Sequence, residues 1–79
     1  SMEYKKVTFA QVKSIIKKEG MFKGFIVGNK VSSMHFFDGW RLACECELNS
    51  LEEAEQLKNR AEIQLESQLG TGIAWYKFI

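Results

Sequence analysis

The chain has 79 residues, which is the length of one two-layer domain and leaves no room for a separate second domain. Its 46% of apolar and 27% of charged residues argue against a disordered chain and against a membrane protein. No apolar run approaches the roughly 18 residues of a membrane span, and the N-terminus lacks the layout of a signal peptide, so we expect a cytoplasmic protein. Ser1 before Met2 is typical of a cloning scar, which leaves residues 2–79 as the expected single domain.

The net charge of +1 hides an uneven distribution along the chain. Seven Lys and two Glu give residues 1–30 a net charge of +5, whereas five Glu, Lys58 and Arg60 give residues 50–69 a net charge of −3. Such a dipolar surface favours an anionic partner or self-association.

A first helix is predicted at residues 9–19. Thr8 is a favourable N-cap, Gln11 completes a capping box three residues later, and Gly20 is placed to end the helix. Apolar residues recur on one face of this helix, namely Phe9, Val12, Ile15 and Ile16.

Three β-rich runs follow, at residues 21–27, 30–37 and 40–48. The dipeptides between them, Gly28-Asn29 and Asp38-Gly39, are typical of two-residue hairpin turns. If both turns have two residues, the paired residues follow by counting outward from each turn. The predicted pairs are Ile26 with Val31, Gly24 with Ser33, Phe37 with Trp40, His35 with Leu42 and Ser33 with Cys44.

A second helix is predicted at residues 51–69, because Ser50 and Glu53 form another capping box and Gly70 follows the last periodic residue. Residues 73–79 are aromatic and apolar on both sides, so they are expected to join the sheet as a fourth strand. The order α-β-β-β-α-β predicts an α+β fold, a small two-layer domain with a mostly antiparallel sheet and both helices packed on one face.

The expected pairing sorts the strand residues onto two faces. The helices should cover the first face, which holds Phe22, Ile26, Val31, His35, Phe37, Trp40, Leu42, Cys44, Cys46 and Leu48. The second face carries an apolar patch of Phe25, Val27, Met34 and Phe36, with Lys23, Lys30 and Arg41 around it. This patch is exposed unless the C-terminal segment or a helix folds over it.

An aromatic face edged by Lys and Arg can stack a planar ring and neutralise phosphates. We therefore hypothesise an anionic, nucleotide-like small ligand. The ligand-binding residues would be Lys23, Phe25, Lys30, Met34, Phe36 and Arg41. A homo-oligomer is also expected, with Val27, Ile63, Trp75 and Tyr76 at its interface.

Catalytic and metal-binding patterns are weak. The pair that could act as nucleophile and base is Cys44 and His35, and both fall on the expected core face, where a thiol is inert. These two residues and Cys46 lack a fourth metal ligand, and no glycine-rich segment has the context of a phosphate loop. We expect no catalytic residue, no metal, no cofactor and no enzyme activity.

The leading hypothesis is a small binding protein that sequesters an anion. Compact chains of this kind are often accessory or counter-defence proteins of phages and mobile elements. An alternative is an inhibitor or adaptor that docks on a host protein through its apolar sheet face. A third is nucleic-acid binding through the N-terminal lysines, Lys5, Lys6, Lys13, Lys17 and Lys18.

Overall fold

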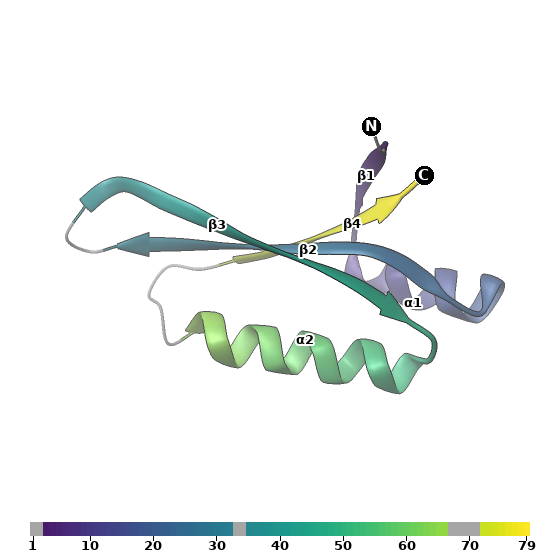
Figure 1. Ribbon diagram of the computed structural model, residues 1–79. Coiled ribbons are helices and arrows are strands. Elements are labelled where there is room, and N and C mark those ends of the chain that lie inside the picture. Colours follow the sequence, from purple (N-terminus) through teal and green to yellow (C-terminus); the bar gives the residue numbers. More distant parts are fainter. Residues whose placement is uncertain (1–2, 33–34, 67–71) are drawn as a thin grey trace.

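A computed structural model describes residues 3–32, 35–66 and 72–79, with side chains described at 3–28, 44–62 and 73–79. In chain order the elements are β1 (Tyr4–Val7), α1 (Phe9–Glu19), β2 (Phe22–Ser32), β3 (His35–Leu48), α2 (Leu51–Glu66) and β4 (Gly72–Phe78) (Figure 1). The predicted α+β class is confirmed, with an additional short strand at the start and with two long strands, β2 and β3, in place of the three predicted at residues 21–48.

The four strands form one sheet in the order β1-β4-β2-β3, and all neighbouring strands are antiparallel. The last strand of the chain therefore lies between the first two. β4 therefore forms backbone ladders along both of its edges, with β1 on one side and β2 on the other. The two chain ends meet where Tyr4 pairs with Phe78 (Figure 1).

The prediction of two tight hairpins was wrong. β2 and β3 form one long hairpin in which Gly28 pairs with Leu42 and Asn29 with Arg41, so Gly28-Asn29 lies inside a strand. The reason is β4, which pairs with β2 from Gly24 to Asn29. A turn at Gly28-Asn29 would remove the last two pairs of that ladder, Gly28 with Ile73 and Asn29 with Gly72.

The predicted register between the strands is corrected accordingly. In the structure, β2 and β3 pair Ile26 with Cys44, Gly24 with Cys46, Lys30 with Trp40 and Ser32 with His35, and the register shifts between Lys30 and Ser32. These pairs replace the predicted partners of Ile26, Gly24, Trp40 and His35, while Ser33 and Met34 lie outside the described residues.

Both helices begin where their caps predict. Thr8 Oγ1 accepts a hydrogen bond from the Gln11 amide at 3.1 Å, and Gln11 Oε1 accepts one from the Thr8 amide at 2.8 Å. Gly20 ends α1 with φ 84°, a left-handed conformation that favours glycine. At α2, Ser50 Oγ accepts from the Glu53 amide, while the Glu53 carboxylate accepts from the Asn49 amide instead of the Ser50 amide that a capping box requires.

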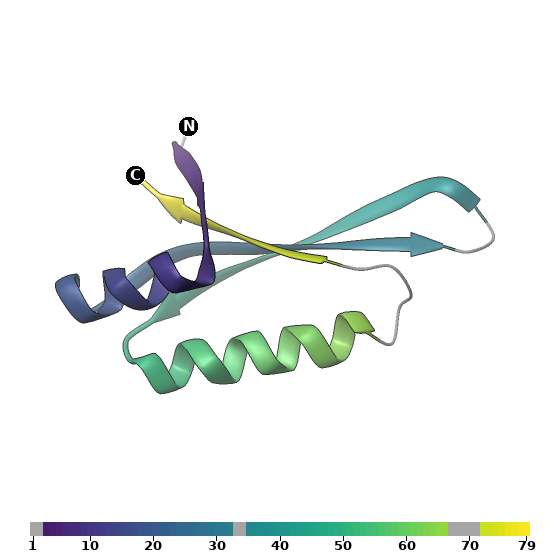
Figure 2. The same ribbon diagram turned by 180° about the vertical axis from the view of Figure 1, so that it is seen from behind.

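The helices lie on the same side of the sheet (Figures 1 and 2), as predicted. Between the layers is a core whose members, among the described side chains, are Val7, Val12, Ile16, Phe22, Ile26, Leu48, Ala54, Ala61 and Trp75. Of the predicted core face, Phe22, Ile26 and Leu48 are buried, Cys46 is half-buried and Cys44 is exposed. The side chains of Val31, His35, Phe37, Trp40 and Leu42 lie outside the described part of the chain.

Neither helix in the described part of the chain has the length and hydropathy of a membrane-spanning helix.

Candidate functional site

Four aromatic rings gather on the sheet face opposite the helices. Along β1, β2 and β4 the side chains alternate, so the neighbours of the buried Val7, Ile26 and Trp75 lie on the other face. We call this group the aromatic platform, and it consists of Tyr4, Phe25, Tyr76 and Phe78. Cross-strand pairing brings its members together, because Tyr4 pairs with Phe78 and Phe25 with Tyr76.

The centre of the aromatic platform is a stacked pair. The rings of Phe25 and Tyr76 are 5.0 Å apart and 9° from parallel. Tyr4 meets both of them edge-on, at centroid distances of 5.1 and 5.6 Å, and Phe78 lies 5.5 Å from Phe25. Tyr4 is 55% exposed and the other three are half-buried, so the aromatic platform offers ring surface to solvent.

Charges of opposite sign border the two sides of the aromatic platform. One row across the sheet runs from Lys6 in β1 through Tyr76 and Phe25 to Glu45 in β3. Lys23 pairs with Glu47 in the same ladder, at the end of β2 next to Phe25. Among the described side chains, the two ion pairs are Lys13 with Glu55 and Lys58 with Glu62, so the ammonium groups of Lys6 and Lys23 have no carboxylate partner there.

An open hollow of about 210 Å³ adjoins the aromatic platform on the β3 side. Its lining is Lys23, Gly24, Glu45, Cys46, Glu47 and Phe78. Two carboxylates against one ammonium make this end acidic, so it suits hydrogen-bond donors, whereas the Lys6 end suits an anion.

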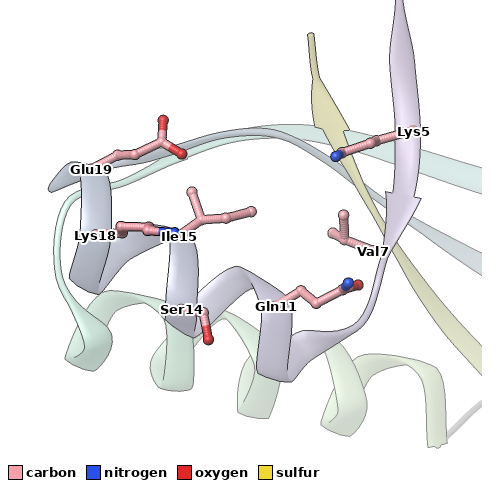
Figure 3. Close-up of a pocket in the computed structure, with 7 residues that line it drawn as sticks. All are labelled: Lys5, Val7, Gln11, Ser14, Ile15, Lys18 and Glu19. Carbon is pink, nitrogen blue, oxygen red and sulfur yellow. The ribbon is translucent and has the colours of Figure 1, made fainter.

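A second hollow of about 270 Å³ lies between β1 and α1, on the helix side of the sheet. Figure 3 shows Lys5 extending from β1 across it, with Val7 and Ile15 as apolar lining and Lys18, Glu19, Ser14 and Gln11 along α1. Gln11 is already engaged in the α1 cap. The sequence did not predict this hollow, because Lys5 faces α1 only once β1 has joined the sheet.

The cysteines offer no nucleophile–base pair with His35. His35 lies nine residues before Cys44 in the same strand, a separation of roughly 30 Å along an extended chain. The predicted register, which placed the two residues on paired strands and diagonal to each other, is therefore wrong for this pair. Burial, together with the neighbouring Cys44, raises the pKa of the Cys46 thiol from 9.0 to about 11. No cluster of three His, Cys, Asp or Glu residues suits a metal within the described ranges.

The structure brings together only part of the predicted ligand-binding and interface residues. Lys23, Phe25, Val27 and Tyr76 lie on the open face. Trp75 lies in the core at 4% exposure and has almost no surface for an oligomer contact. The side chains of Lys30, Phe36, Arg41 and Ile63, and the whole of Met34, lie outside the described part of the chain.

Three residues of this face were missed from the sequence, namely Tyr4, Lys6 and Phe78. Tyr4 and Lys6 belong to a four-residue strand with one buried side chain, which carries almost no local strand signal. Phe78 was predicted to be in a strand, and its place beside Phe25 follows only from the sheet order.

No protein-family model, curated protein or solved structure shows a significant match to this chain.

Proposed function

We propose that this chain is a binding module without catalytic activity that holds an anionic, nucleotide-type ligand on the aromatic platform. The observation that supports this most is the stacked Phe25–Tyr76 pair on the open face, in a row with Lys6, which pairs with Tyr76 across β1 and β4. The planar ring of the ligand would lie on the exposed aromatic surface, and its phosphate would lie on the β1 side.

The aromatic rings support the first half of this proposal. Stacking of a base on an aromatic side chain contributes about 1–3 kcal/mol, and it tolerates different bases because every base has a π-face. The edge-on contacts of Tyr4 hold the Phe25 and Tyr76 rings in place, so part of the conformational entropy loss on binding is already met before the ligand arrives.

The charges support an orientation. Lys6 and Glu45 are separated by three strand spacings of about 4.8 Å each. A phosphate is attracted to the Lys6 end, and the carboxylates of Glu45 and Glu47 can accept hydrogen bonds from exocyclic amino groups of a base. A base with an amino group should therefore bind more tightly than one without.

Isothermal titration calorimetry with adenosine monophosphate tests the proposal, using paired variants. Phe25→Leu removes the stacking ring and keeps an apolar side chain, while Phe9→Leu changes an aromatic residue on the helix side. Lys6→Gln removes the expected phosphate contact, while Lys17→Gln removes an exposed lysine of α1.

We expect Phe25→Leu and Lys6→Gln each to weaken binding by about tenfold or more, and the two controls to leave the dissociation constant unchanged. Raising the salt concentration should weaken wild-type binding and affect Lys6→Gln less. Equal losses in Phe25→Leu and Phe9→Leu would contradict the proposal. Absence of nucleotide binding would instead favour a protein partner on the same apolar face, whose affinity should hardly depend on salt.

A further inference from the structure

The two edges of the sheet differ in how well they are protected. The β1 edge is four residues long and contains Lys5 and Lys6. The β3 edge is 14 residues long and its sequence contains neither Lys nor Pro. Short edges and edge lysines prevent strands of other molecules from pairing, so β1 is protected in a way that β3 is not.

The part of β3 from Trp40 to Leu48 is also regular. It pairs with β2 without interruption, since the register shift lies between Lys30 and Ser32. In the part of the chain that the structure describes, no backbone hydrogen bond outside the β2 ladder involves β3. Among the described residues its outward edge therefore has no backbone partner, and the side-chain contact there is the Cys44 thiol, 3.5 Å from the Glu45 carbonyl oxygen.

The charge pattern of β3 is complementary to itself when the strand is reversed. In an antiparallel pair, a two-fold axis at Ala43 places Arg41 opposite Glu45 of a second copy, and an axis at Cys44 places it opposite Glu47. Axes at Glu45 or Cys46 would place glutamates opposite one another, and an axis at Leu42 would leave Arg41 without an opposite charge.

We propose that a second copy of this chain pairs antiparallel with β3, on an axis at Ala43 or Cys44, and forms a continuous eight-stranded sheet. Because such an axis is perpendicular to the sheet, the aromatic platforms of the two copies lie on the same side of the joined sheet. Cys44, which is exposed in the single chain, then lies at or beside the axis. Neither proposal requires the other, although both involve Glu45 and Glu47. The axis at Ala43 pairs Glu45 with Arg41 and leaves Glu47 for the ligand, and the axis at Cys44 does the reverse.

Sedimentation equilibrium of charge-exchange variants tests the interface. Wild type should be a dimer, and Arg41→Glu should weaken dimerisation by tenfold or more because like charges then face each other. Lys17→Glu makes the same charge change on α1 and should remain dimeric. Circular dichroism checks that each variant is folded. If Arg41→Glu fails to fold, Glu45→Arg and Glu47→Arg test the same contact from its other side.

Combined exchanges identify the register. Restoration of the dimer by Arg41→Glu with Glu45→Arg places the axis at Ala43, and restoration by Arg41→Glu with Glu47→Arg places it at Cys44. A monomeric wild type, or a folded Arg41→Glu variant that dimerises as wild type does, would overturn the proposal. So would a loss of dimerisation that neither exchange reverses.

Discussion

Gly24 lies in β2 directly beside the backbone of β4, where it pairs with Lys77. It is buried, and a Cβ atom built on it would collide with the carbonyl oxygen of Tyr76 in the neighbouring strand. The stacking of Phe25 on Tyr76 takes place one residue further along the same ladder. The close approach of the two backbones therefore depends on the absence of a side chain at residue 24.

Gly24→Ala should lower the free energy of unfolding by about 1–3 kcal/mol, as overpacking in a tight interior does. Urea unfolding followed by circular dichroism measures this loss. Gly20→Ala provides the comparison, because Gly20 has open space around it. The stability lost in that variant should reflect only the strain of the positive φ at residue 20. A Gly24→Ala variant as stable as wild type would show that the strands can separate without a loss of stability.

The thiol of Cys46 gives the fold a dependence on alkaline pH. Its pKa is raised from 9.0 to about 11, so the folded state holds the proton more tightly than the unfolded state. The contribution of the protonated thiol is complete below about pH 9 and is lost as the pH rises through about 11.

Thermal unfolding of wild type and Cys46→Ala at several pH values checks this expectation. The difference in melting temperature between the two should be largest near pH 8 and should shrink as the pH approaches 11, because only wild type loses the buried thiol proton. All other residues are the same in the two proteins, so their effect cancels in the difference. A difference that stays constant with pH would contradict the assigned burial of Cys46.

The first helix shows how local signals decide an element. The reciprocal hydrogen bonds of Thr8 and Gln11 close its N-terminus, and Gly20 closes its C-terminus. Thr8→Ala should reduce the free energy of unfolding by about 1 kcal/mol. Ser14→Ala removes a hydroxyl from an exposed position inside the same helix and should be neutral or slightly stabilising. Chemical denaturation of both variants separates a capping effect from the loss of a hydroxyl group.

The bounds of α1 and the start of α2 could be predicted from sequence because their signals lie within a few residues of each helix end. Strand pairing is not local. Gly28-Asn29 and Asp38-Gly39 have the composition of turns, yet both lie inside strands, and β4 pairs with β2 across Gly28-Asn29. The order β1-β4-β2-β3 could not be foreseen, because it depends on a strand that is 40 residues away from β2 in the sequence.

The part of the open face that depends only on local alternation could also be predicted. Alternation along one strand sufficed to place Lys23, Phe25 and Val27 on a common face, whichever strand is their neighbour. Tyr4 and Phe78 contact Phe25 only through the inserted β4, so their place in the aromatic platform required the sheet order.

At the scale of the whole molecule, Trp75 joins the layers. Its ring lies 5.2 Å from that of Phe9 in α1 and 6.4 Å from that of Phe22 in β2. Trp75→Ala should lower the free energy of unfolding by about 3–5 kcal/mol, a large share of the stability of so small a domain. Trp75→Phe should retain the fold with a smaller loss. Far-UV circular dichroism melts measure both, and a folded, stable Trp75→Ala would refute the placement of this residue in the core.

The central claim is that the uncovered sheet face binds the ligand, and a map of backbone amide chemical shifts during a titration with adenosine monophosphate tests it most directly. Binding at this face should give concentration-dependent shifts at Tyr4, Lys6, Phe25 and Tyr76, with the amides of α1 and α2 unmoved. Shifts centred on Lys5, Ser14 and Lys18 would place the ligand in the hollow between β1 and α1 and contradict the claim. An unchanged spectrum at millimolar ligand would contradict nucleotide binding altogether.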